Sequence, residues 1–183
     1  MSTPHSSADP GSRRYLKAAA AGVVGGLAGT WAMNQAQRFW SDMMNARPPE
    51  SAGGKHDARD WQERSENQNS NELAADALAR TFIGRSLTER ELAIAAPAVH
   101  FAFGAAVAGL YGVCTRFDRR RTGAGVAMGV ALWLIADELA MPLLGLSRPT
   151  TERPLEMHLQ AFGAHVVYGY VTEAARHATR SVL

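Results

Sequence analysis

The stretch TGAGVAMGVALWLIADELAMPLLGL, residues 122–146, decides how this chain folds. It is 25 residues long and carries only two charged side chains, the adjacent Asp137 and Glu138. About 20 apolar residues in a helix cross the hydrocarbon core of a bilayer, so this stretch predicts a transmembrane helix. A carboxylate at the centre of such a helix costs about 2.5–3.5 kcal/mol on insertion scales, so we expect both groups to face protein rather than lipid.

Three further apolar segments lie on either side of this stretch. Residues 92–114 (LAIAAPAVHFAFGAAVAGLYGVC) have no formal charge, and residues 18–33 are almost free of charge. The last segment is weaker, because it carries Glu156, His158 and His165, and it would insert by pairing with its predecessor. We therefore predict an all-α integral membrane bundle of about four transmembrane helices. The predicted helices span about 16–36, 92–114, 122–146 and 155–175.

The distribution of Lys and Arg predicts the topology, because short cytoplasmic loops concentrate these residues. Four spans with both chain ends in the cytoplasm put every basic flank on the cytoplasmic side, as expected in a bacterial inner membrane. Residues 37–91 then form one long extracytoplasmic loop. A three-span protein would put one basic flank on the wrong side. The basic flanks contain Arg13, Arg14 and Lys17, then Arg116, Arg119, Arg120 and Arg121, then Arg176 and Arg180; the turn between the last two spans has only Arg148 and Arg153.

Two alternatives to this topology stay open. Arg13 and Arg14 precede an apolar run, as in a twin-arginine targeting signal whose apolar segment is later removed. We favour a retained helix, because no clear A-x-A cleavage site follows and the run continues into Trp31 and Asn34, which suit a membrane interface. The other alternative is a soluble bundle of buried apolar helices, and release from membranes by sodium carbonate would establish it.

The polar parts of the chain suggest a simple domain organisation. Residues 1–14 are small and polar and are expected to be disordered, which leaves 15–183 as a single membrane domain. Within loop 37–91, a Pro/Gly patch and a polar tract predict a flexible stretch. Apolar residues at helical spacing predict a short amphipathic helix around 72–83. Thr88 and Glu91 have the spacing of a capping box.

Glycines at helical spacing suggest how the helices pack. Helices in a membrane associate by close backbone approach at small residues, since lipid tails are as apolar as leucine. The glycines are not a nucleotide fingerprint, because no strand precedes them. The glycines expected at helix contacts are Gly22, Gly25, Gly26, Gly29, Gly109, Gly112, Gly125 and Gly129.

Ionisable residues in three predicted spans fall at a similar depth, roughly 12–15 Å from the outer end at a rise of 1.5 Å per residue. Asp137 and Glu138 are about 100° apart around their helix, so we expect one to meet His100 or His165 and the other to face elsewhere. Pro142 lacks an N–H and should free the carbonyl of Glu138. The candidate buried polar cluster comprises His100, Asp137, Glu138, His158 and His165.

This cluster has a functional and a structural interpretation. It could serve as a proton relay, a metal site or a small-ligand cavity, or it could only fix helix register through hydrogen bonds. No short metal-ligand motif, cofactor motif or nucleophilic constellation accompanies it, so we predict no catalytic residue, no metal and no cofactor. The single cysteine, Cys114, excludes an intrachain disulfide. A net charge of +2 is too small to indicate nucleic acid as a partner.

Several stretches resemble the YagU-like family of small bacterial inner-membrane proteins. They are TWAMN at 30–34, VHFAFG at 99–104, Tyr111-Gly112, GVALWLIADELAMPLLGLS at 129–147, and His158 with HVVYG at 165–169 and Thr172-Glu173. The ADE-x-A-x-P-x-x-GLS pattern within them is fairly specific. The resemblance implies an integral membrane protein of about four helices and supplies no agreed activity, so it assigns no catalytic residue.

Three functions are compatible with the sequence. The first is a non-enzymatic inner-membrane protein whose His/carboxylate cluster serves a proton- or pH-linked envelope role. The second is an interaction or scaffold protein. Its partners would be the lipid bilayer and, through residues 37–91, either further copies of the chain or another envelope protein. The third is an oligomeric transporter or channel, which would need several copies because four helices are few and no inverted repeat is evident.

Overall fold

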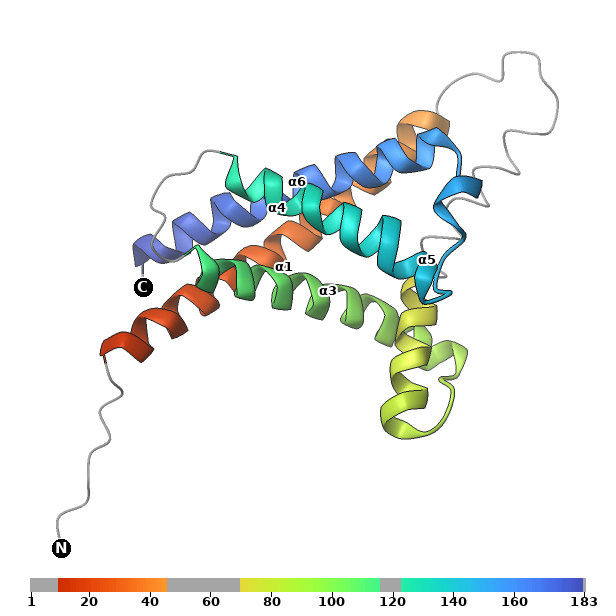
Figure 1. The fold of residues 1–183 in the computed structure, drawn as a ribbon, viewed down its shortest axis with the longest axis horizontal. Helices are drawn as coiled ribbons and strands as arrows, with labels where there is room; N and C mark the ends of the chain where they lie inside the picture. Colours follow the sequence, from red (N-terminus) through yellow and green to blue (C-terminus); the bar gives the residue numbers. More distant parts are fainter. Residues whose placement is uncertain (1–9, 46–69, 116–122, 183) are drawn as a thin grey trace, which may run out of the picture.

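A computed structural model describes residues 10–45, 70–115 and 123–182, and every regular element in these ranges is helical. The all-α prediction is therefore confirmed. A further helix, at residues 70–83, follows the first one. The named helices are α1 (Pro10–Asn45), α3 (Glu89–Cys114), α4 (Ala124–Leu132), the π-helix η1 (Trp133–Ala140), α5 (Met141–Leu143), the 3₁₀-helix η2 (Thr150–Glu152) and α6 (Leu155–Val182) (Figure 1).

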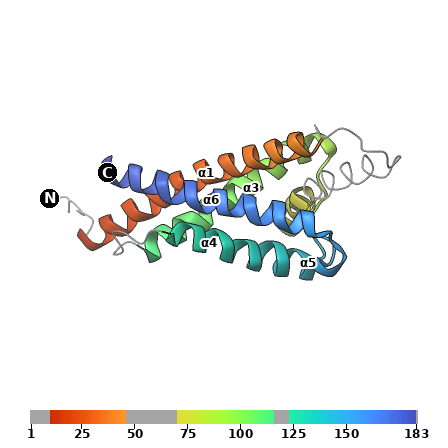
Figure 2. The same ribbon diagram turned by 90° about the horizontal axis from the view of Figure 1, so that it is seen from above.

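The long helices lie side by side in a row. α1 packs on α3 along one side and on α6 along the other, and α4 packs chiefly on α6. α4, η1 and α5 follow one another without a break and form one continuous rod (Figure 1). α1 begins and α6 ends at one end of the bundle, whereas the α5–α6 connection lies at the other (Figure 2).

Three helices in the described ranges are long and apolar enough to cross a membrane: Gly11–Met44, Glu89–Cys114 and Ala124–Leu143. The fourth predicted span is α6, which has 28 residues but is more polar than these three. The third span ends at Leu143 rather than 146, because Gly145 turns the chain at a φ of 68°. There the N–H of Leu146 donates to the carbonyl of Met141 at 2.9 Å, which closes the helix end.

The first helix is longer than the predicted 16–36. Residues 10–14, expected in a disordered N-terminus, and residues 37–45, expected in the polar loop, belong to α1. Gln37, Ser41 and Met44 recur at helical spacing and are half-buried, so one face of the added turns is shielded from solvent. Residues 1–9, the Pro/Gly patch and most of the polar tract, and four of the predicted loop arginines lie outside the described residues.

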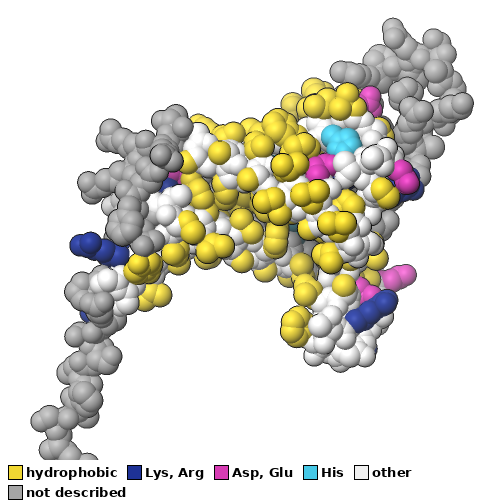
Figure 3. All heavy atoms as spheres, in the orientation of Figure 1, with side chains coloured by type: hydrophobic (Ala, Val, Ile, Leu, Met, Phe, Trp, Pro, Cys, Tyr) yellow, Lys and Arg dark blue, Asp and Glu magenta, His cyan; other side chains and the backbone are white. Residues whose placement is uncertain are grey.

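The surface of the bundle is apolar and its interior is small or polar. Leu110, Ile135 and Leu143 keep 67%, 61% and 83% of their surface exposed. The largest fully buried side chains are instead Arg176, Tyr168, Thr30 and Thr172, and most other buried residues are alanines or glycines. Figure 3 shows one face whose middle is covered by hydrophobic side chains, with Lys and Arg towards the ends. Lipid-facing proteins have this arrangement, because only the interior can satisfy polar groups.

Two pairs of glycines let α1 approach its two neighbours. Gly22 and Gly26 face α3, and a Cβ added at Gly26 would lie 2.6 Å from the carbonyl oxygen of Gly104. Gly25 and Gly29 face α6, where a Cβ at Gly25 would lie 2.5 Å from the carbonyl oxygen of Thr172. No real Cβ comes this close to a carbonyl oxygen, so side chains here would push the helices apart.

The other predicted glycines also lie at helix contacts. Gly109 and Gly112 of α3 face α1, and Gly125 and Gly129 of α4 face α6. Two glycines outside the prediction, Gly104 and Gly169, complete these contacts from α3 and α6. The hydroxyl of Tyr168 also donates to the carbonyl of Gly104 at 2.6 Å and joins α6 to α3.

The predicted capping box at the start of α3 is confirmed. The Glu91 carboxylate accepts the Thr88 N–H at 2.8 Å, while the Thr88 hydroxyl accepts the Glu91 N–H. Arg85 donates to both Glu91 oxygens at 2.6 and 2.8 Å, and this hydrogen bonding raises the pKa of Arg85. The Asp76 carboxylate accepts the N–H of Leu87 at 2.8 Å, so helix 70–83 is tied to the start of α3.

Candidate functional site

The site begins with the π-helix η1, which contains both carboxylates of the opening stretch. At its end the N–H of Met141 donates to the carbonyl of Ala136, five residues back. Pro142 follows and has no N–H. The carbonyl of Asp137 therefore has no helical donor, and that of Glu138 loses its ordinary one.

The α5–α6 connection supplies the missing donors. Arg153 Nη2 donates to the Asp137 carbonyl at 2.9 Å, and the Thr150 hydroxyl donates to the Glu138 carbonyl at 2.8 Å. The sequence predicted that Pro142 frees the Glu138 carbonyl, and the structure shows that the Thr150 hydroxyl donates a hydrogen bond to it. The connection is thereby fastened across the end of η1.

The Glu138 side chain, 7% exposed, lies between a histidine and an arginine. Its Oε1 is 2.8 Å from His158 Nδ1, and its Oε2 is 3.4 Å from Arg153 Nη2. The other ring nitrogen of His158, Nε2, is 3.1 Å from the carbonyl oxygen of Thr150. Both ring nitrogens thus face acceptors, and only a doubly protonated ring donates to both. We refer to Glu138, Thr150, Arg153 and His158 as the glutamate centre.

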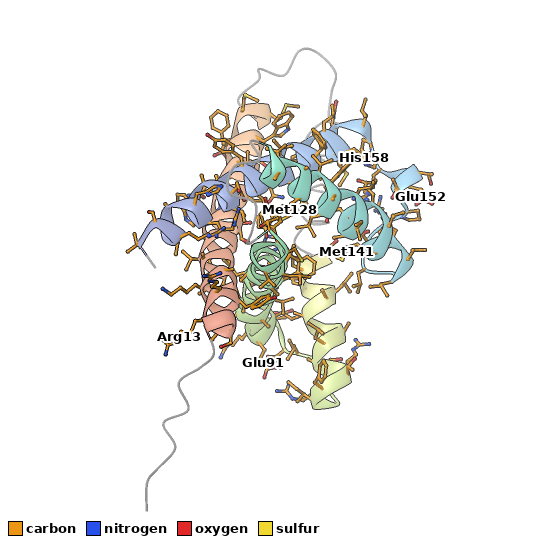
Figure 4. The ribbon with its side chains drawn as sticks, turned by 60° about the vertical axis from the view of Figure 1, so that its left-hand side comes forward. Arg13, Glu91, Met128, Met141, Glu152 and His158 are labelled. Atoms are coloured by element: carbon orange, nitrogen blue, oxygen red, sulfur yellow. The ribbon has the colours of Figure 1, made fainter. Side chains whose placement is uncertain are left out.

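Figure 4 shows the position of the glutamate centre in the bundle. His158 lies near Glu152 of the α5–α6 connection, at the opposite end of the molecule from Arg13 in the first turn of α1. The centre is therefore close to one end of the helices rather than at their middle.

Asp137, although adjacent to Glu138, has a different environment. Its Oδ2 is 3.8 Å from His165 Nδ1, too far for a hydrogen bond. The same His165 nitrogen is 2.9 Å from the carbonyl oxygen of Ala161, which can only accept, so the proton on Nδ1 is directed there. The Asp137 side chain stays 33% exposed, whereas that of His165 is 6% exposed. The two carboxylates point in different directions, and His165 is the histidine near Asp137.

His100 is separate from both carboxylates among the described contacts. It is half-buried on α3, and its ring meets that of Phe101 edge-on with centroids 6.4 Å apart. α3 packs chiefly on α1, whereas η1 belongs to the rod that packs on α6. Of the two histidines predicted to meet a carboxylate, His165 lies beside Asp137, and His100 is within electrostatic range of His165.

The contact between the rod and α6 changes character along its length. At the α4 end, backbones touch, because a Cβ at Gly129 would clash with the carbonyl of His165 and one at Gly169 with that of Gly125. At the η1 end, side chains fill the space. Trp133 and Phe162 meet edge-to-face with ring centroids 5.2 Å apart, followed by the Asp137–His165 and Glu138–His158 pairs.

A second buried ionic site, absent from our prediction, lies in the C-terminal half of α6. Arg176 is 1% exposed and donates to both Glu173 oxygens, from Nε at 3.0 Å and from Nη2 at 2.6 Å. Its guanidinium carbon is 5.3 Å from the centre of the Tyr111 ring on α3, and His177 Nε2 is 2.7 Å from Glu173 Oε1. We refer to Tyr111, Glu173, Arg176 and His177 as the arginine centre.

The arginine centre adds a detail to the predicted topology. Arg176, predicted in the basic cytoplasmic flank, is buried between helices and paired within its own helix. Glu173 precedes it by three residues, the spacing at which side chains of a helix meet, and this was the available signal. Arg180 alone then represents that flank in the described part of α6.

The described residues contain no group of three or more His, Cys, Asp or Glu side chains that could hold a metal ion. The ionisable side chains form pairs instead. Such pairs can fix helix position, bind a proton, or attract a charged ligand.

These features define a class: an all-helical protein with an apolar surface, candidate membrane spans and ion pairs inside. The chain belongs to a family described as proteins of unknown function, DUF1440, whose model matches residues 69–174, more than half of its length. The matched range includes the whole glutamate centre but ends before Arg176. No curated protein and no solved structure matches the chain.

Proposed function

We propose that this chain is a four-span protein of the bacterial inner membrane with both ends in the cytoplasm and residues 46–69 outside. The resemblance to the YagU-like family supports the bacterial inner membrane. The 28-residue length of α6 and its packing against α1 support a fourth span, because the polar side chains of His165, Thr172 and Arg176 are buried. α6 then ends on the same side on which α1 begins (Figure 2).

Reporter fusions test this topology. Alkaline phosphatase inserted at residue 60 should be active, because the enzyme folds only outside the cytoplasm, and a fluorescent protein fused after residue 183 should fluoresce. An active phosphatase at the C-terminus would leave three spans and overturn the proposal.

We further propose that the glutamate centre gives the protein a pH-linked role in the envelope. The observation that carries this proposal is the position of His158 between the Glu138 carboxylate and the Thr150 carbonyl. The charged groups facing it are Glu138 from η1 and Arg153 from the connection. His158 can donate to both acceptors only while it carries two protons, so loss of one proton at higher pH leaves one ring nitrogen facing an acceptor without a hydrogen. The connection should loosen from η1.

A spin label on the connection tests the pH-linked role. Thr151 is exposed, so a Thr151→Cys, Cys114→Ser protein can carry a label there. Label mobility should increase as the pH rises from about 5 to 8. His158→Gln should abolish this dependence, whereas His177→Gln, a histidine of the arginine centre, should leave it. A dependence that survives His158→Gln would contradict the proposal.

One observation favours a structural role as the second candidate. Thr150 and Arg153 satisfy two carbonyls that Pro142 leaves without helical donors, and this alone would stabilise the fold. A scaffold protein, alone or as a homo-oligomer, needs no more than that. Glu138 and His158 variants would then reduce the amount of folded protein at every pH and leave no pH-dependent difference.

A further inference from the structure

Asp137 is a partly exposed carboxylate inside a helix that is long and apolar enough to span the membrane. We propose that Asp137, together with the aromatic pair Trp133 and Phe162, forms a binding site for a lipophilic organic cation. The site rests on the membrane placement of the rod and not on the pH-linked role of the glutamate centre.

The charge of Asp137 is not neutralised by a hydrogen-bonded cation among the described contacts. The nearest basic nitrogen is His165 Nδ1 at 3.8 Å, and its proton is directed at the Ala161 carbonyl. Arg153 reaches only the main-chain carbonyl of Asp137, while its side-chain partner is Glu138. The Asp137 carboxylate is therefore left without a hydrogen-bonded cation at the surface of the rod.

This charge has an energetic cost that its neighbour avoids. A carboxylate inside a membrane-spanning helix is unfavourable unless it finds a partner. Glu138, 7% exposed, has His158 and Arg153, whereas Asp137 is 33% exposed. A positively charged partner arriving through the hydrocarbon would offset the cost.

The surroundings of Asp137 define the chemistry of that partner. Trp133 lies four residues before Asp137, about one turn away, and contacts Phe162, which is 37% exposed. Aromatic faces attract cations, and tryptophan does so most strongly. Leu134, Ile135 and Leu139, which are near Asp137 in the sequence, are also exposed and bring no further charge. A bulky, apolar quaternary ammonium or phosphonium ion matches one carboxylate beside two aromatic rings.

A small inorganic ion fits this position less well. Divalent metals in proteins take three or more protein ligands in typical sites. Asp137 and His165 supply two groups, and the described residues contain no larger set of metal-ligating side chains.

Binding of tetraphenylphosphonium to the purified full-length protein in nanodiscs tests the site, with tetraphenylborate as a probe of similar shape and opposite charge. The wild type should bind the cation and not the anion. Asp137→Asn should weaken cation binding roughly tenfold or more, since a nearby unit charge is removed from a low-dielectric site. Trp133→Leu should weaken it about threefold. Glu173→Gln, which alters an acid of the arginine centre, should leave it unchanged.

Three results would overturn the proposal: equal binding of both probes, unchanged binding by Asp137→Asn, or no binding by the wild type. Asp137→Glu keeps the charge, so its retention of binding shows that loss in Asp137→Asn is not misfolding. If the wild type ignores the cation but forms a dimer that Asp137→Asn dissociates, a second copy covers the carboxylate and the proposal is wrong. Release of the chain by carbonate would instead refute the membrane placement.

Discussion

The glutamate centre and the arginine centre bury similar charges in different ways. The arginine centre pairs Arg176 with Glu173 inside one turn of α6, and both hydrogen bonds are short. The glutamate centre assembles residues from η1, the connection and α6, and its Arg153–Glu138 contact is longer, at 3.4 Å. A pair within one helix needs only that helix, whereas the glutamate centre exists only if the connection closes over η1. The glutamate centre is therefore the one that can form and break as the connection moves towards or away from η1.

The largest expected effect comes from removing the cation of each centre. Arg176→Leu should destabilise the protein by about 3–5 kcal/mol, because it leaves Glu173 partly buried without its main partner. Arg153→Leu should cost less, because His158 still pairs with Glu138 at 2.8 Å. Denaturant titration in mixed micelles measures both. A larger loss of stability in Arg153→Leu than in Arg176→Leu would show that the glutamate centre contributes more to the fold than the arginine centre.

A smaller effect is expected from crowding the arginine centre. A Cβ at Gly125 would lie 2.5 Å from the Cβ of Glu173, so Gly125→Ala should destabilise by about 1–3 kcal/mol through overpacking. Gly163 of α6 is the matched control, because a Cβ there meets nothing within 4 Å. Gly163→Ala should be neutral or slightly stabilising. Equal effects of the two alanines would show that α4 does not approach α6 as closely as described.

Removing one donor of the connection should have a still smaller effect. Thr150→Val keeps the shape but deletes the hydrogen bond to the Glu138 carbonyl, at a cost of about 1 kcal/mol. Thr151→Val, at an exposed neighbouring position, serves as the control. Amide exchange of the connection should accelerate in Thr150→Val only. Unchanged exchange would mean that Thr150 does not hold the connection.

The smallest change concerns Pro142. Pro142→Ala returns an N–H to the helix, so the carbonyls of Asp137 and Glu138 regain a competing donor. Competition from this new donor should weaken the hydrogen bonds of Thr150 and Arg153 and show as faster label motion at position 151, with little change in global stability. Unchanged or slower motion would show that the new N–H does not displace Thr150 or Arg153.

Much of the fold followed from local rules. Charge-free runs of sufficient length predicted the helices, glycine spacing indicated the contacting faces, and Thr88 and Glu91 predicted a capping box. These features depend on residues within about one helical turn of each other, so they can be recognised directly from the sequence. The consequence of Pro142 for the Glu138 carbonyl was predictable for the same reason.

The remainder depends on which segments meet. η1 has no sequence signature, because a π-helix arises where the surroundings supply the hydrogen bonds that it leaves open. The depth estimate grouped His100 with the carboxylates, but depth says nothing about which helix is the neighbour, and α3 packs on α1. Arg176 was assigned from its position near the chain end, which does not reveal where a side chain points.

The short third span also ties the protein to the thickness of its bilayer. Its 20 residues, Ala124–Leu143, extend about 30 Å at 1.5 Å per residue, close to the thickness of a typical hydrocarbon core. The 26 residues of Glu89–Cys114 are longer and can tilt to compensate. The rod is attached to α6 in two ways: α4 touches α6 through the backbone, and η1 touches α6 through ionic side chains. A thicker or thinner bilayer would therefore strain these two attachments.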